Sequence, residues 1–105
     1  MVKNEKVLKE FKSQVKNLYG NRLKEIILYG SWARGEATED SDIDLIVVLE
    51  GSVEPGKEID RMIDIITDIN LRYNVLISVY PVNNEDYITL KSPLLMSARR
   101  EGVPT

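Results

Sequence analysis

Residues 29–45 read YGSWARGEATEDSDIDL, and this stretch decides the fold. A short apolar run, residues 26–28, precedes its Gly-Ser pair, and a second run, residues 45–49, follows its last two aspartates. Both runs are typical of buried strands bounded by turn residues. We therefore expect a tight turn and two carboxylates at the ends of neighbouring strands. That arrangement suits a phosphate group and a metal ion.

The Gly-Ser pair and the two aspartates each have a chemical reason to bind a phosphorylated ligand. Gly30 and Ser31 let the backbone approach a ligand closely, and N–H groups at the start of a following helix can donate to phosphate oxygens. Asp42 and Asp44 are two residues apart at a strand start, so both carboxylates project from one side. A divalent cation would offset their repulsion. Each pattern alone is common in proteins that bind nothing, so the interpretation depends on the combination.

The composition limits the chemistry that is open to this chain. Its 105 residues, 43% of them hydrophobic, suit one compact domain. Cysteine and histidine are absent, which excludes disulfides, thiolate or imidazole metal sites, a catalytic cysteine and a Ser-His-Asp triad. Any bound metal must therefore be a hard cation held by oxygen atoms. No apolar run is long enough to span a membrane and no secretory signal is recognisable, so we expect a soluble, cytoplasmic protein with no membrane partner.

The charged residues are distributed unevenly around a net charge of −3. Residues 1–24 carry seven Lys or Arg and two Glu, whereas residues 36–68 carry eleven Asp or Glu and two basic residues. Affinity for a nucleic-acid backbone requires clustered basic side chains, so we expect no strong nucleic-acid binding. An acidic middle is better suited to a divalent cation that then receives a polyphosphate.

The periodicity of apolar residues predicts an alternation of helices and strands. The fold class is α/β (α+β), with a small mixed or parallel sheet of about three strands and helices packed on it. Leu94, Leu95 and Met96 are expected to pack on this domain, with contact to a partner as the alternative. The predicted elements are a helix over residues 3–19, a strand over 24–29, a helical turn over 32–35, a strand over 43–49, a helix over 55–73, a strand over 75–82, and short helices over 83–90 and 94–100.

The central motif resembles that of a known superfamily. Gly30-Ser31, ten further residues and then Asp42-Ile43-Asp44 match the signature of the polymerase-β-like nucleotidyltransferases, and Gly35 falls where many members have a second glycine. The chain length is similar to that of the minimal nucleotidyltransferases (MNT), which are often encoded beside a helical HEPN protein as a toxin–antitoxin pair. The resemblance implies a nucleotidyltransferase fold, with residues 1–105 forming a single minimal nucleotidyltransferase domain.

The resemblance also implies an activity and a set of site residues. A member of this superfamily would transfer AMP from ATP to a hydroxyl of a protein partner, here a HEPN-type toxin, and would act as the antitoxin. Asp42 and Asp44 would be the catalytic and metal-binding residues for Mg²⁺, and Gly30, Ser31 and Arg34 would bind the nucleotide. Arg34 has a structural or solvated role as its alternative. Trp32 is expected either to stack on a base or to pack beneath the turn.

The chain departs from the superfamily pattern at one position. Active members generally have a third carboxylate on a later strand, whereas alternation in residues 75–80 places Ser78 on the face that would carry it. Ser78 supplies no charge, so we expect a single bound metal ion in preference to a two-metal site. The alternative function is a weak or inactive nucleotidyltransferase-fold module that neutralises its partner by binding.

Overall fold

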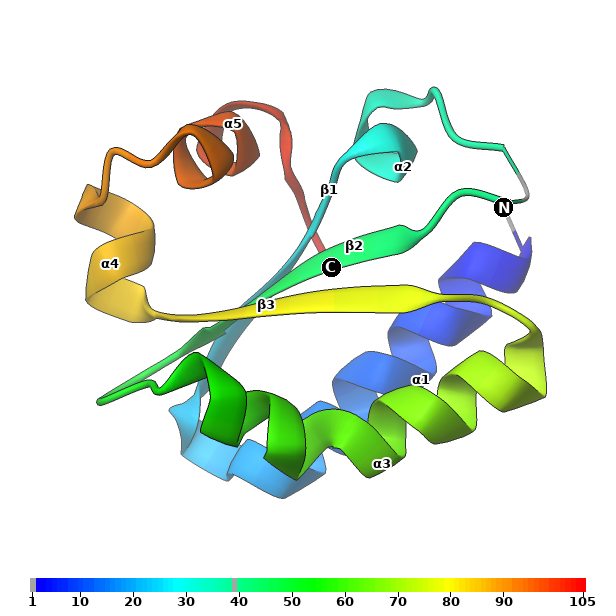
Figure 1. Ribbon diagram of the computed structural model, residues 1–105, viewed down its shortest axis with the longest axis horizontal. Coiled ribbons are helices and arrows are strands. Elements are labelled where there is room, and N and C mark those ends of the chain that lie inside the picture. Colours follow the sequence, from blue (N-terminus) through cyan, green and yellow to red (C-terminus); the bar gives the residue numbers. More distant parts are fainter. Residues whose placement is uncertain (1, 39) are drawn as a thin grey trace.

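The computed structural model describes residues 2–38 and 40–105, without the side chains of residues 2–4. Each predicted element is present, with ends that differ from the prediction by at most two residues. The elements are the helices α1 (Val2–Tyr19), α2 (Ser31–Arg34), α3 (Pro55–Tyr73), α4 (Asn84–Thr89) and α5 (Pro93–Glu101), the 3₁₀ helix η1 (Gly20–Arg22), and the strands β1 (Leu23–Tyr29), β2 (Ile43–Leu49), β3 (Ile77–Asn83) and β4 (Val103–Pro104) (Figure 1).

The strands form one mixed sheet in the order β3-β2-β1-β4. β1 runs antiparallel to both β2 and β4, whereas β2 and β3 are parallel. The predicted fold class is confirmed, but the expectation of about three strands was one too few. β4 pairs with Ile27 and Leu28 through two residues, one of them a proline. So short a strand has no alternating pattern that a sequence could reveal.

Helices cover both faces of the sheet. α1 and α3 lie side by side under one face, and α5 lies over the other (Figure 1). α2 follows the end of β1, and its Trp32 and Ala33 pack against the core on the side of α1 and α3. The pleat of β2 divides its side chains accordingly: Leu45 and Val47 join the larger core with α1 and α3, and Ile46 and Val48 join the smaller core with α5. Because β2 is buried on both faces, its sequence is a nearly continuous apolar run.

α3 begins and ends at residues with the required backbone preferences. Pro55 occupies its first turn, where the missing N–H is not needed. Asn74 ends it in the left-handed region, with φ 52°.

Among the residues that the structure describes, no helix is both long and apolar enough to cross a membrane.

The smaller core depends on α5. Leu95 is fully buried there, whereas the neighbouring Met96 is 44% exposed. We expect Leu95→Ala to lower the free energy of unfolding by about 2–5 kcal/mol, because it removes buried methyl groups and leaves a cavity. Met96→Ala is the matched control and should cost less than about 1 kcal/mol. Urea denaturation of both variants measures the difference; equal, small losses would contradict this packing of α5.

Candidate nucleotide and metal site

The pairing of β1 with β2 brings the glycine-serine turn to the aspartates. Tyr29, the last residue of β1, lies opposite Asp44 in the antiparallel register. The chain then turns at Gly30, with φ 73° and ψ −154°, and α2 begins at Ser31. A Cβ atom on residue 30 would overlap Oδ2 of Asp44. The Asp44 carboxylate therefore lies directly against the turn.

Gly30 is required for two separate physical reasons. Its backbone dihedrals fall in a region that is essentially restricted to glycine. The space where a side chain would be is occupied by the Asp44 carboxylate. Position 30 thus fixes the turn and makes room for the acidic group at the same time.

Asp42 lies close enough to Asp44 for its charge to affect the Asp44 carboxyl. Asp44 is half-buried and Asp42 is exposed. Burial raises the pKa of the Asp44 carboxyl, the negative charge of Asp42 raises it further, and the Arg34 guanidinium lowers it. Two repelling carboxylates with oxygen donors only are a suitable beginning of a site for a hard divalent cation.

No third acidic ligand completes the pair in the part of the chain that the structure describes. No group of three or more potential metal-ligating side chains is found within residues 2–38 and 40–105. The parallel register places Ser78 of β3 beside Asp44, on the same side of the sheet. Its side chain is exposed and neutral. The residues present therefore fit one divalent cation whose remaining ligands would be water or phosphate oxygens.

Arg34 lies at the end of α2 and is already paired with acidic side chains. Its Nε donates to Oε1 of Glu36 at 2.6 Å, and its Nη1 lies 4.0 Å from Oε2 of Glu101 on α5. The hydrogen bond to Glu36 is the main reason why the pKa of Arg34 is raised, with smaller contributions from the charges of Glu101 and Asp44. The guanidinium is therefore exposed, positively charged and near the aspartates, where it could contact a phosphate.

Trp32 packs under the turn, which was one of its two predicted roles. Its indole is half-buried against the larger core, and its Nε1 donates to the carbonyl oxygen of Ser41 at 3.2 Å. In this position the indole supports the loop that leads into β2.

Sequence analysis gave no role to two tyrosines on the site face. Tyr29 is half-buried, and burial, the charge of Asp44 and the nearby Tyr80 raise its pKa, in that order. Tyr80 lies two residues after Ser78 on β3 and is 37% exposed. Alternation along the two strands was the available signal, since it places both tyrosines on the face of Asp44.

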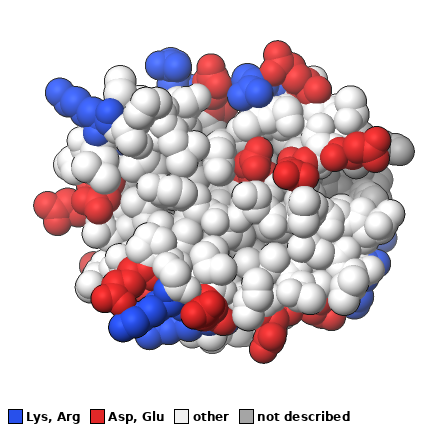
Figure 2. Space-filling view, viewed as in Figure 1, with Lys and Arg blue, Asp and Glu red and all other residues white. Residues whose placement is uncertain are grey.

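The surrounding surface is acidic on this side of the molecule. Figure 2 shows a row of acidic side chains to the right of the centre of this face, and both acidic and basic side chains along the top edge above it. A negative potential of this kind attracts cations.

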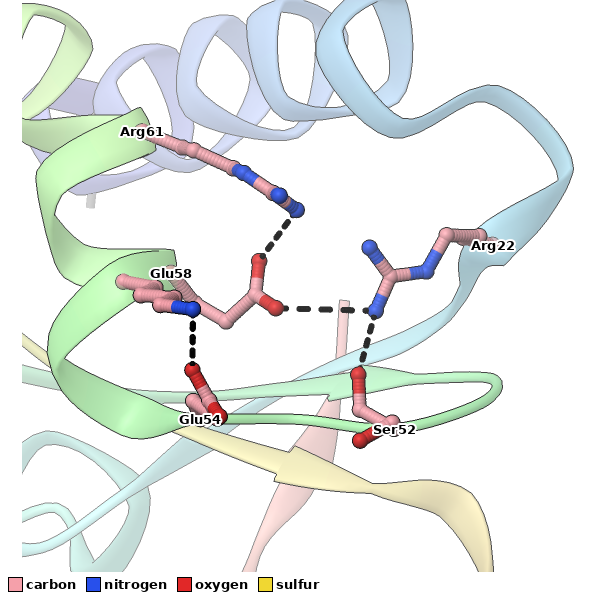
Figure 3. A pocket seen from close by; sticks show the side chains of 6 residues that line it. Arg22, Ser52, Glu54, Glu58 and Arg61 are labelled. Carbon is pink, nitrogen blue, oxygen red and sulfur yellow. Dashed lines mark hydrogen bonds and ion pairs between the residues drawn. The ribbon is translucent and has the colours of Figure 1, made fainter.

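A pocket lies at the end of the β1–β2 pair that is opposite to Gly30 and Asp44, and its charged side chains stabilise the fold. Glu58 is only 3% exposed and accepts a hydrogen bond from the Tyr19 hydroxyl at 2.8 Å. Arg61 and Arg22 lie 3.2 Å and 3.6 Å from its carboxylate (Figure 3). Burial and the hydrogen bond to Glu58 raise the pKa of Tyr19. The pocket is lined by Arg22, Ser52, Glu54, Lys57, Glu58 and Arg61.

Comparison with known proteins identifies the class to which this fold and site belong. The model of the nucleotidyltransferase domain family matches residues 5–93, so the chain belongs to that family and is a nucleotidyltransferase-like enzyme. The predicted resemblance is thereby confirmed.

Individual relatives agree with this assignment. A Methanocaldococcus jannaschii protein, named as a candidate protein adenylyltransferase, is 43% identical over 81 residues, covering 77% of this chain and 75% of the relative. Two solved structures share the fold. One, described as a toxin–antitoxin with AMP-PNP, has a TM-score of 0.63 at 14% identity and covers 90% of this chain and 68% of that chain. The other, described as a candidate minimal nucleotidyltransferase, has a TM-score of 0.61 at 22% identity. It covers 96% of this chain and 94% of that chain.

The contact between Gly30 and Asp44 can be tested directly. We expect Gly30→Ala to lower the free energy of unfolding by about 1–3 kcal/mol through backbone strain. It should also weaken Mn²⁺ binding, because the new methyl group displaces the Asp44 carboxylate. Electron paramagnetic resonance of free Mn²⁺ measures the binding, and urea denaturation measures the stability.

Gly51→Ala is the matched control for this experiment. Gly51 also has a positive φ, 88°, but a Cβ there would meet no atom within 4 Å. Strain alone should therefore lower stability and leave Mn²⁺ binding unchanged. If Gly30→Ala bound Mn²⁺ as tightly as the wild type, the Asp44 carboxylate would not belong to a metal site.

Proposed function

We propose that this chain transfers AMP from ATP to a hydroxyl group of a protein partner. The observation that supports this most is the Asp44 carboxylate against the Gly30 turn. A carboxylate suits a metal ion and a glycine turn suits a phosphate group, and a nucleotide with its cation requires both. The name of the 43% identical relative, a candidate protein adenylyltransferase, supports a protein as the acceptor.

Each site residue has a role in this proposal. The first N–H groups of a helix lack intrahelical acceptors, so those that follow Gly30 at the start of α2, including that of Ser31, would donate to phosphate oxygens. Arg34 would exchange part of its contact with Glu36 for a contact with phosphate. Asp42 and Asp44 would hold Mg²⁺ through their oxygens, with ATP as the substrate.

The proposed reaction is an in-line displacement at the α-phosphorus of ATP. The acceptor oxygen forms a bond to that phosphorus, the bond between the α-phosphorus and the bridging oxygen breaks, and pyrophosphate leaves. The hydroxyl proton is lost to solvent. A divalent cation stabilises the negative charge that develops on the leaving oxygens. Asp42 and Asp44 would act by holding that cation.

We further propose that the partner is a HEPN-type toxin and that the chain is its antitoxin. The fold shared with a structure described as a toxin–antitoxin with AMP-PNP supports this assignment. The resemblance to the minimal nucleotidyltransferases supports it too.

A second candidate function is neutralisation of the partner by binding alone. The specific observation in its favour is Ser78, which takes the place beside Asp44 where a third carboxylate is expected. The experiments below separate the two functions.

The first test is transfer of labelled AMP. The chain, its partner, Mg²⁺ and α-labelled ATP should give a labelled partner, and Asp42→Asn or Asp44→Asn should abolish the labelling. If the pair contributes about 4 kcal/mol to the transition state, the rate falls on the order of a thousandfold. Asp60→Asn, at an exposed position on α3, is the control and should label normally.

The same variants separate enzyme from binding module. Unchanged labelling in both site variants would reject the assigned site. Full neutralisation of the partner by both variants, with an intact complex and no added AMP mass, would favour neutralisation by binding.

The second test concerns the missing carboxylate. We expect Ser78→Asp to raise turnover or tighten Mg²⁺ binding, because it adds an oxygen ligand beside Asp44. Thr67→Asp adds the same charge at an exposed position on α3 and should change neither. If Ser78→Asp folds but alters neither quantity, position 78 does not face the metal.

A further inference from the structure

Trp32, the single tryptophan of the chain, connects the two halves of the site. It lies in α2, one residue after Ser31. Its Nε1 donates to the carbonyl oxygen of Ser41, which directly precedes Asp42. One side chain therefore joins the phosphate-binding end of the site to the metal-binding end.

The end of the loop between α2 and β2 is held on both sides of Asp42. After Asp42, the N–H of the buried Ile43 donates to the carbonyl of Leu76 at 2.9 Å. Before Asp42, the described contacts of the loop are local ones and the bond from Trp32. The N–H of Ser41 donates to the carbonyl of Thr38 at 3.1 Å, and the N–H of Thr38 donates to Oγ of Ser41 at 3.0 Å. Both bonds join one part of the loop to another. The indole of Trp32 packs on the larger core and so provides the fixed point.

Asp42 needs such support more than Asp44 does. Asp44 lies within β2 and is held by pairing with Tyr29 on one side and Ser78 on the other. Asp42 precedes the strand and is exposed. Ile43 holds the chain after Asp42 through its bond to Leu76, so the support from Trp32 acts on the residue before it.

We propose that Trp32 is a positioning residue that holds Asp42 beside Asp44 for cation binding. The proposal rests on the proposed function, and it assigns to the indole N–H a role apart from filling space under the turn. When the hydrogen bond to Ser41 is lost, the pair no longer binds a cation as one unit. Loss of this bond lowers the affinity for the cation. It changes the rate of AMP transfer much less once the cation is bound.

The test compares Trp32→Phe with the wild type. Phenylalanine keeps an aromatic ring against the core and removes the N–H donor. We expect the Mn²⁺ concentration at half-saturation, measured by electron paramagnetic resonance, to rise about three- to tenfold, the range for one lost hydrogen bond. The same increase should appear in the Mg²⁺ dependence of AMP transfer, with turnover at saturating Mg²⁺ within about twofold of the wild type.

Tyr73→Phe is the matched control for loss of stability. The Tyr73 hydroxyl donates to Oε1 of Glu10 at 2.9 Å, between α3 and α1. This variant also loses one aromatic hydrogen bond and should leave both cation measurements unchanged. Equal Mn²⁺ binding by Trp32→Phe and the wild type would overturn the proposal.

A second measurement needs no substitution at Trp32. Because the indole contacts the residue before Asp42, its fluorescence in the wild type should change with added Mg²⁺ and reach a plateau. Asp42→Asn should abolish that change. If the fluorescence stayed constant while electron paramagnetic resonance showed Mn²⁺ binding, the role of Trp32 would be overturned and the proposed function would stand. A wild type that neither binds Mn²⁺ nor transfers AMP would overturn both.

Discussion

The antiparallel pairing of β1 with β2 is the constraint on which the rest of the structure depends. It sets Tyr29 opposite Asp44, so the residue that follows β1 meets the carboxylate near the start of β2. A shift of one residue would turn Asp44 into the core and bring Leu45 to the site, because strand side chains alternate between faces. The burial of Leu45 and Val47 under α1 and α3 makes such a shift costly. The hydrophobic core therefore fixes the geometry of the acidic site.

The closeness of the Asp42 and Asp44 carboxylates is electrostatically unfavourable. Burial and the charge of Asp42 raise the pKa of Asp44. The folded chain therefore stabilises the ionised form of this carboxylate less than water does. Arg34 relieves only part of the repulsion and is itself shared with Glu36 and Glu101. Carboxyl groups whose pKa is raised by burial and a neighbouring charge are common at functional sites.

The sequence predicted most of the fold and part of the candidate site. Residues 55–73 were predicted as a helix with the observed ends, because apolar periodicity, Pro55 and Asn74 all agree. The place of Ser78 beside Asp44 followed from alternation in a short strand. β4 escaped prediction because two residues carry no period. The bond from Trp32 to Ser41 also escaped, since a contact across a loop depends on how the loop closes. The roles of Asp42, Asp44 and Arg34 stay predictions.

The location of Ser78 has a consequence for how such a protein can evolve. It lies on β3, at one end of the strand order, and its side chain is exposed. Surface positions of this kind tolerate replacement with little change in folding stability. An exchange at this position can therefore change the charge beside Asp44 while the scaffold stays intact. One substitution adds a carboxylate to the pair of aspartates, and the reverse substitution removes it.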